Sequence, residues 1–299
     1  MAKGRARRGV VRVCVEVLVV VSLVLWGATP AFAAKPAGKA SHGGGGGGTS
    51  TPTGNDVSYP QCGSSLPASP AFGIVGVNDG LANNLNPCLG PSSSYPSYTE
   101  SELYWAVASS TGKSTQPKAS LYVNTADPGN GVADWPTSGG GGGYGSCTGT
   151  DSDACAWQYG YNKATQDAAW LTSAASDIDG QLNSTTVSGN PASYPWWLDV
   201  ETANTWQSDT SMNVADLQGM VAGLAAAGAS TVGVYSTSYQ WGQITGTSPL
   251  GTLQGLPDWI PGARTLSGAE LNCSLNSFTG GSVTVTQWFS HPDGDYACQ

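Results

Sequence analysis

The sequence predicts an α/β fold, a TIM-like (β/α) barrel that becomes incomplete in its last third. Two observations predict it. Short runs rich in β-branched and aromatic residues alternate with helical patterns, and several of these runs are apolar on both faces. The alternation favours a parallel sheet, and apolar residues on both faces are typical of a sheet that is covered on both sides. The length from Asn55 to Gln299 fits a barrel as well as an open sheet.

Each expected strand is short and bounded by turn-forming residues. We expect the strands at Phe72–Val77, Ser120–Asn124, Trp196–Val200, Thr231–Tyr235 and Val283–Phe289. After Gly251 the helical pattern fades, so we expect the final third of the chain to consist of strands and loops.

Three helices lie between these strands. Thr99 and Glu102 have the spacing of a capping box, which predicts that a helix begins there. Asn162 is expected to begin the second helix. Asn213 is expected to cap the third, and Gly228 to end it, because glycine favours the left-handed conformation that often follows a helix.

The first residues have the pattern of a secretory signal peptide, which we assign to residues 1–33. A basic segment precedes the apolar run Val17–Trp26, and Ala31-Phe32-Ala33 provides a small-x-small cleavage site. The alternative is a membrane anchor, but the apolar run is about half of the roughly 20 residues needed to span a bilayer. We therefore expect a secreted protein with no membrane contact after cleavage.

A flexible linker is expected at residues 34–54. It is rich in Gly, Ser, Thr and Pro, and it includes the glycine run Gly43–Gly48. Such a composition buries too little apolar surface to fold. The barrel domain is then expected at residues 55–299, as a monomer.

Charge excludes one class of partner. Beyond residue 54 the basic residues are Lys113, Lys118, Lys163 and Arg264, whereas every acidic residue of the chain except Glu16 lies there. Nucleic-acid binding needs clustered Lys and Arg, so no nucleic-acid partner is expected. An acidic surface favours an uncharged or cationic ligand.

Several enzyme classes are also disfavoured. The two histidines are His42 and His291, and no G-x-S-x-G elbow accompanies them. Gly112-Lys113-Ser114 lacks the earlier glycine of a phosphate loop, and no dinucleotide fingerprint follows a strand. We expect no cofactor and no metal.

The cysteines that remain after the signal peptide agree with export, because an even number favours disulfides in an oxidising compartment. The sequence leaves their connectivity open, and we predict the sequential pairing. Its pairs are Cys62–Cys88, Cys147–Cys155 and Cys273–Cys298. A zinc site is the alternative, but close cysteine pairs and histidines are lacking.

The strongest site signal is the acidic pair Asp199-Val200-Glu201 at the end of an expected strand. Side chains two residues apart on a strand point the same way, so the two carboxyl groups should project together. In a β/α barrel the carboxyl ends of the strands form the active-site face. A close carboxyl pair keeps one proton near neutrality, and glycoside hydrolysis uses such a pair. A structural role as a cap is the alternative.

The order of four motifs resembles the family 25 glycoside hydrolases, the Chalaropsis-type lysozymes. The family's G-x-D-V-S-x-x-Q opening is similar to Gly54-Asn55-Asp56-Val57-Ser58-Tyr59-Pro60-Gln61, and its D-x-E strand is similar to Leu198-Asp199-Val200-Glu201. A later strand of the family is similar to Gly233-Val234-Tyr235-Ser236-Thr237. Its closing strand, which an aspartate follows, is similar to Gln287-Trp288-Phe289 with Asp293 and Asp295. These motifs span most of the expected domain.

The resemblance implies an incomplete β/α barrel that cleaves the β-1,4 bond after N-acetylmuramic acid in peptidoglycan. Glu201 would be the general acid, and Asp199 would assist it or orient the acetamido group of the substrate. Asp56 and a tail aspartate would line the same pocket, and we choose Asp295 over Asp293.

The substrate-binding residues are expected on the same strands. We name Tyr235, Trp288, Trp197, Asn78 and Asp79. For the tryptophans the alternative is a place in the core. Where the family carries K-A-T-E-G and Y-H motifs, this chain has Val77-Asn78-Asp79-Gly80 and Tyr122-Val123-Asn124, so its subsite walls are expected to differ.

Two hypotheses about function follow. The first is a secreted glycoside hydrolase that cleaves peptidoglycan or a related amino-sugar polysaccharide by carboxylate acid/base catalysis. The alternative is a catalytically inactive barrel that serves as a secreted carbohydrate-binding protein through its aromatic residues. A disulfide-stapled surface protein without a ligand ranks third.

Overall fold

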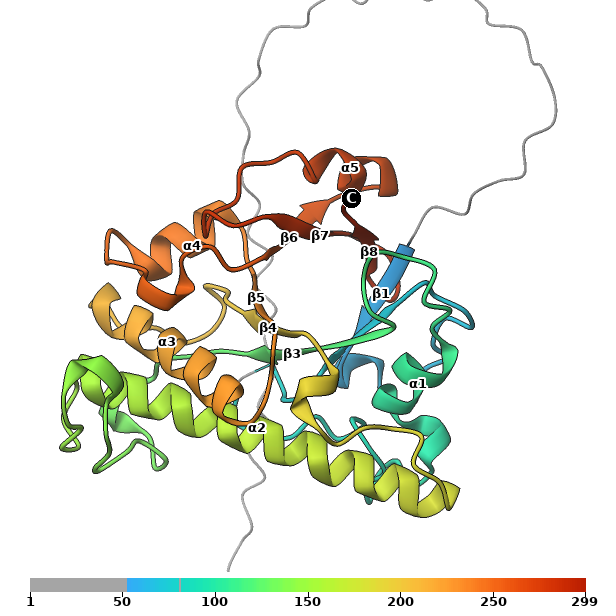
Figure 1. Ribbon diagram of the computed structural model, residues 1–299, viewed down its shortest axis with the longest axis horizontal. Coiled ribbons are helices and arrows are strands. Elements are labelled where there is room, and N and C mark those ends of the chain that lie inside the picture. The colour runs from blue at the N-terminus through green and yellow to red at the C-terminus, as the bar shows by residue number, and fades with distance from the viewer. Residues whose placement is uncertain (1–52, 81) are drawn as a thin grey trace, which may run out of the picture. The chain divides into compact units, whose positions relative to one another are not determined.

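The strands of the protein close into a barrel in the order β1 to β8, as the computed structural model shows for residues 53–80 and 82–299 (Figure 1). They are β1 (Thr53–Val57), β2 (Gly73–Gly76), β3 (Ala119–Asn124), β4 (Trp196–Asp199), β5 (Val232–Tyr235), β6 (Asp258–Ala263), β7 (Val283–Trp288) and β8 (Gly294–Ala297). Neighbours from β1 to β7 are parallel, and β8 is antiparallel to both β7 and β1. The predicted α/β barrel is therefore confirmed.

The predicted signal peptide at 1–33 lies outside the described residues, as does the predicted linker at 34–54 except for its last two residues. These two, Thr53 and Gly54, already belong to β1. The barrel thus begins slightly before the expected boundary at Asn55.

Five α-helices follow β2 to β6 in turn within the described chain. They are α1 (Glu102–Ser109), α2 (Asp153–Leu182), α3 (Thr210–Ala226), α4 (Ser238–Thr245) and α5 (Leu266–Asn272). Short 3-10 turns are η1 (Tyr59–Gln61), η2 (Tyr98–Glu100), η3 (Gly129–Gly131), η4 (Gly142–Tyr144), η5 (Pro191–Ser193) and η6 (Gly251–Leu253). No α-helix occurs in the described residues between β1 and β2 or between β7 and β8. The barrel is therefore incomplete in its helices, while its sheet is closed. The expectation of strands and loops alone after Gly251 was wrong, because α5 lies between β6 and β7.

The predicted strands overlap β2, β3, β4, β5 and β7, but the predicted helix starts need correction. Ser101 caps α1 with its hydroxyl, whereas the capping box observed just before it joins Ser97 and Glu100 at η2. Helix α2 begins at Asp153, well before Asn162. Serine and threonine are frequent here, so several neighbouring residues compete as caps.

The start of α3 also differs from the prediction. Asp209 caps this helix, and Asn213 lies inside it. The buried Asn213 side chain donates hydrogen bonds to the carbonyls of Gln207 and Ile244. The end is close to the prediction, because α3 stops at Ala226 and Gly228 has a φ of +106°.

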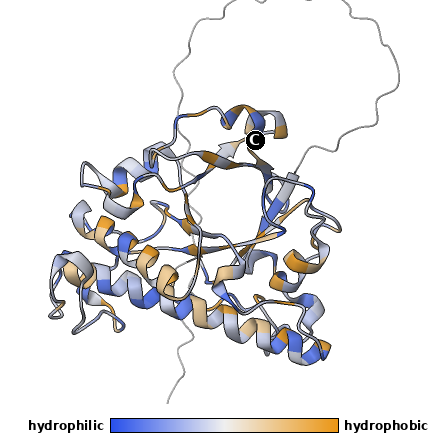
Figure 2. Ribbon diagram, viewed as in Figure 1, coloured by the Kyte–Doolittle hydropathy of each residue, from blue (hydrophilic) through white to orange (hydrophobic). Residues whose placement is uncertain are grey.

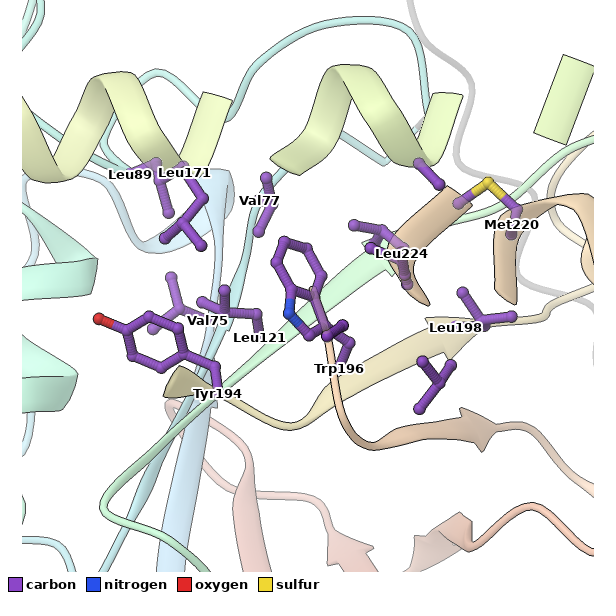
Figure 3. Close-up of a cluster of buried hydrophobic side chains, with 14 of the residues drawn as sticks. Val75, Val77, Leu89, Leu121, Leu171, Tyr194, Trp196, Leu198, Met220 and Leu224 are labelled. Atoms are coloured by element: carbon purple, nitrogen blue, oxygen red, sulfur yellow. The ribbon is translucent and has the colours of Figure 1, made fainter. Parts of the chain in front are cut away.

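Alternation along the strands divides the apolar residues into two layers. On β4, Trp196 and Leu198 point outward, and they pack with Met220 and Leu224 of α3 (Figure 3). Trp197, which lies between Trp196 and Leu198, points into the barrel. The barrel interior is filled by Phe72, Ile74, Trp197, Trp259, Val285 and Ala297. Helix α2 runs along the outside of this sheet, and hydrophilic segments recur along it (Figure 2).

Three disulfides join Cys62 to Cys88, Cys147 to Cys155 and Cys273 to Cys298, so the predicted sequential pairing is confirmed. The last one ties the C-terminal residues to the chain after α5. Within the described ranges, no helix has the length and apolar character that crossing a membrane requires.

The barrel interior should not tolerate a side chain at Gly233. A Cβ atom there would overlap the Trp197 ring and lie 2.8 Å from the Pro257 carbonyl oxygen. Because overpacking a core costs about 1–3 kcal/mol, Gly233→Ala is expected to lower the unfolding free energy by that amount. Gly180→Ala is the matched control, since no atom lies within 4 Å of that site on α2. Helix propensity should make the control more stable by up to about 1 kcal/mol. Urea unfolding of both variants tests this, and a neutral Gly233→Ala would contradict it.

Candidate active site

A cavity of about 300 Å³ opens at the carboxyl ends of the strands. In a β/α barrel this is the face on which the loops after the strands bring functional side chains together. The cavity is lined by Asp56, Ser58, Tyr59, Pro60, Gln61, Gly80, Tyr122, Asn124, Asp199, Glu201, Tyr235, Trp259, Gln287 and Asp293.

The predicted acidic pair lies at this cavity. Asp199 is the last residue of β4 and is 7% exposed, whereas Glu201 follows the strand and is more exposed. The Gln240 amide of α4 donates to Glu201 Oε1 at 3.3 Å, and the Trp206 indole donates to the Glu201 carbonyl at 2.8 Å. The residues after β4 and β5 together therefore fix the position of Glu201 in the mouth of the barrel.

A chain of hydrogen bonds holds Asp56 on the opposite wall. The Gln287 amide of β7 donates to Asp56 Oδ2 at 2.9 Å. Gln287 in turn accepts the Tyr235 hydroxyl on its Oε1 atom at 3.0 Å. Strands β1, β5 and β7 are thereby connected across the cavity by side chains whose orientations are mutually fixed.

Burial and mutual repulsion keep protons in this site. Burial raises the pKa of Asp199 well above its usual range, and the negative charges of Glu201 and Asp56 add to the effect. Burial also raises the pKa of Asp56 to about 6, although the hydrogen bond from Gln287 opposes the shift. Asp199 and Asp56 therefore hold their protons to a higher pH than ordinary aspartates do, which suits acid/base chemistry.

Four predicted site residues meet in the cavity: Asp56, Asp199, Glu201 and Tyr235. The prediction for Asp295 needs correction, because this residue is fully buried and does not line the cavity. Its Oδ1 atom accepts the Trp259 indole at 2.9 Å, and its side chain interacts with Asp56. Of the two tail aspartates, Asp293 is the one that lines the cavity.

Neither tryptophan predicted to bind substrate lines the cavity. Trp197 is 3% exposed and fills the barrel interior below the site. Trp288 points to the outside of β7, where it packs beside Ala263, Tyr296 and Cys298. Alternation explains the position of Trp288, because a residue next to the inward-facing Gln287 must face outward, whereas Trp197 faces inward but lies below the cavity.

The two polar residues predicted after β2 also do not line the cavity. Asn78 is buried, and it exchanges hydrogen bonds with the backbone of Asn124, which ties β2 to β3. Asp79 accepts hydrogen bonds from the backbone of Asn83 and Asn84 within its own loop. These residues therefore hold the backbone beside the cavity in place and do not themselves line it.

Some cavity residues were not predicted. Trp259 lies on β6, a strand that Pro261 and Gly262 obscure in the sequence because both are unfavourable in strands. Tyr59 follows β1 and is 46% exposed. Gln287 belongs to the closing motif Gln287-Trp288-Phe289, so this motif could have identified it as a cavity residue.

The protein is thus a closed β/α barrel with an acidic pocket at the carboxyl ends of its strands, the face that carries the active site in barrel enzymes. A family model described as lysozyme-like protein 1 matches residues 172–259, a range that includes Asp199 and Glu201. The probable GH family 25 lysozyme 4 of Dictyostelium discoideum is 43% identical over 61 residues, which cover 20% of this chain and 28% of that protein. The chain resembles the family 25 glycoside hydrolases, as the motifs indicated.

Two solved structures are also similar. The bacterial lysozyme of Streptomyces coelicolor is 16% identical with a TM-score of 0.44, over 84% of this chain and 94% of that one. The muramidase of Trichobolus zukalii is 16% identical with a TM-score of 0.41, over 82% of this chain and 92% of that one.

Proposed function

We propose that the protein is a secreted glycoside hydrolase that cleaves peptidoglycan or a related amino-sugar polysaccharide by carboxylate acid/base catalysis. The observation that carries this proposal is the gathering of Asp56, Asp199 and Glu201 around one open cavity. The resemblance to lysozyme-like proteins supports the same class of substrate.

In this proposal Glu201 donates a proton to the leaving glycosidic oxygen. It is the more exposed member of the pair, and the Gln240 amide holds one of its oxygens. Asp199 lies deeper beside it, where its carboxyl group can orient a polar group of the sugar and stabilise the positive charge that develops at the sugar ring. Asp56 and Asp293 line the remaining acidic wall, and Asp295 positions Asp56 from behind.

Aromatic side chains supply surfaces for sugar rings. Tyr59 stands exposed at the rim, and the partly buried Tyr235 lines the cavity. We propose that these residues take the role predicted for Trp197 and Trp288.

Glu201→Gln is expected to reduce the rate of peptidoglycan cleavage at least about a hundredfold, because general acid catalysis contributes that much or more. Binding should persist, since the amide keeps the shape of the carboxyl group. Cosedimentation with insoluble peptidoglycan measures binding separately from cleavage. Glu270→Gln on α5 is the matched control, because the same change lies outside the cavity. Equal loss of rate in both variants would exclude the role of Glu201.

The alternative is a catalytically inactive barrel that binds polysaccharide. The structural use of Asn78 and Asp79 favours it, because these residues stand where the family carries a different motif. This alternative predicts binding without any release of sugar, and weaker cosedimentation for Tyr59→Ala. Cleavage that Glu201→Gln abolishes would contradict it.

We also propose export of the mature protein, residues 34–299, as a monomer. The three disulfides support an oxidising compartment. N-terminal sequencing of protein collected from the culture medium should begin at Ala34. Retention of Met1 in a membrane fraction would show an anchor instead.

A further inference from the structure

The disulfide between Cys62 and Cys88 has a carboxyl group beside it. Cys62 directly follows η1, and Cys88 lies in the loop between β2 and η2. A carboxyl oxygen of Glu102, the first residue of α1, lies within 4.8 Å of both sulfur atoms. Among the described residues, no His, Asp or Glu side chain lies this close to both sulfurs of either other disulfide.

We propose that Cys62–Cys88 is a thiol–disulfide exchange site, in which a small thiol attacks Cys62 and Glu102 supplies the proton that Cys88 takes up. The co-reactant is a small-molecule thiol from the surroundings of the protein. This inference does not depend on the proposed function.

The two sulfur atoms differ in access. Cys62 is partly exposed, whereas Cys88 has no exposed surface. A cavity of about 410 Å³ opens beside them, and its lining includes Gln61 and Gly63, the two neighbours of Cys62, together with Glu102. A thiolate from solvent therefore reaches Cys62, and Cys88 becomes the sulfur that leaves.

A buried leaving sulfur needs a proton donor. The rate of exchange depends on how readily the displaced thiolate leaves, and apolar surroundings disfavour a thiolate. Glu102 is 1% exposed, and its buried Oε1 atom has no hydrogen-bond partner among the described residues. Burial raises the pKa of Glu102 to about 8, so the carboxyl group holds its proton at neutral pH. That proton is available to Cys88.

Asn86 fixes the carboxyl group and the disulfide relative to each other. Its side-chain amide donates to the Gly76 carbonyl and to Glu102 Oε2, both at 2.7 Å. Its Oδ1 atom accepts the Cys88 backbone N–H at 3.1 Å and lies 3.4 Å from Cys88 Sγ. A thiol formed on Cys88 therefore has an acceptor already in place.

The surroundings of Glu102 do not hold it in its ionised form. The titratable groups that face it are Glu100 of η2 and Tyr104 of α1, which line the same cavity, and Tyr122 of β3, on whose pKa its charge acts. No Lys, Arg or His lines this cavity.

The exchange needs no oxidant beyond the disulfide itself. The incoming thiolate forms an S–S bond to Cys62 while the Cys62–Cys88 bond breaks, and the electron pair of that bond leaves with Cys88. Glu102 gives its proton to Cys88 and later regains one from solvent. The product is a mixed disulfide on Cys62 and a thiol on Cys88. The adduct lies next to Tyr59, Pro60 and Gln61, which line the candidate active site.

Reduction by dithiothreitol, followed by alkylation and peptide mass spectrometry, measures each disulfide separately in the intact protein. Glu102→Gln is expected to slow the opening of Cys62–Cys88 at least about tenfold, because a general acid contributes that much or more. The other two disulfides are internal controls and should open at unchanged rates. Glu100→Gln is the matched control, since the same change at an exposed neighbour should alter none of the three.

The pH dependence gives a second readout, which a purely structural role of Glu102 would not produce. For the wild type, the rate constant per dithiothreitol thiolate should fall as the pH rises through about 8, where Glu102 loses its proton. For Glu102→Gln it should be low at every pH. With cysteine as the thiol, the adduct should form on Cys62.

Three results would overturn the proposal. They are an unchanged rate in Glu102→Gln, an adduct on Cys88, and opening of all three disulfides at one common rate. The last result would mean that reduction proceeds through global unfolding of the domain.

Discussion

Raising the pH from about 5 to about 8 is expected to lower the free energy of unfolding by at least about 3 kcal/mol. Buried carboxyl groups cause this. Burial raises the pKa of Glu102 from 4.5 to about 8 and that of Asp127 from 3.8 to about 7. Asp167, Asp199 and Asp216 are shifted in the same direction.

The sign follows from proton binding. Above pH 5 the unfolded chain has released these protons, whereas the folded chain keeps them until the pH passes the raised pKa values. The folded state then binds more protons, so stability falls as the pH rises through about 5 to 8. Below the unfolded pKa values both states are protonated, and this contribution no longer changes.

Thermal unfolding at a series of pH values measures the effect. For a domain of this size, about 3 kcal/mol corresponds to a fall in Tm of roughly 10 °C. Glu102→Gln should flatten the curve, because an amide still accepts the hydrogen bond from the Asn86 amide but does not ionise. A Tm that rises steadily from pH 5 to 8 would contradict the expectation.

Trp259→Ala is expected to destabilise the domain by about 3–5 kcal/mol, as removal of a large core aromatic does. The side chain is 2% exposed, and its ring contacts those of Tyr122, Trp197 and Tyr235 at centroid distances of 6.2, 5.8 and 4.5 Å. The same substitution removes the indole N–H that Asp295 accepts.

A second variant separates packing from hydrogen bonding. Trp259→Phe keeps an aromatic ring in the barrel but loses the donor to Asp295 and part of the ring volume, so a smaller cost of about 1–3 kcal/mol is expected. Tyr239→Ala is the control, because that side chain is 71% exposed. It should stay within about 0.5 kcal/mol of the wild type in urea unfolding. Similar losses for Trp259→Ala and Tyr239→Ala would show that the interior ring is not part of the core.

Local patterns predicted the class of fold and the main acidic pair. The runs around Trp196 and Val234 are apolar on both faces, which identifies buried parallel strands. The period of two residues placed Asp199 and Glu201 together, and the structure brings them to one cavity.

The remaining errors come from contacts between distant parts of the chain. Strand β1 is mostly polar along Thr53–Val57, so the local sequence does not identify it as a strand. It is held in the sheet by pairing with both β2 and β8. Trp197 and Trp288 were placed by residue type, although the barrel's curvature and alternation decide which side chains face the cavity. The choice between Asp293 and Asp295 depends on the antiparallel turn into β8, which local sequence does not specify.

Release of new reducing ends from purified peptidoglycan, followed in parallel for the wild-type protein and Glu201→Gln, tests the central claim most directly. The carboxylate cavity predicts steady release by the wild type and a rate at least about a hundredfold lower for the variant. Equal rates for the two proteins, or no release by a folded wild type, would contradict it.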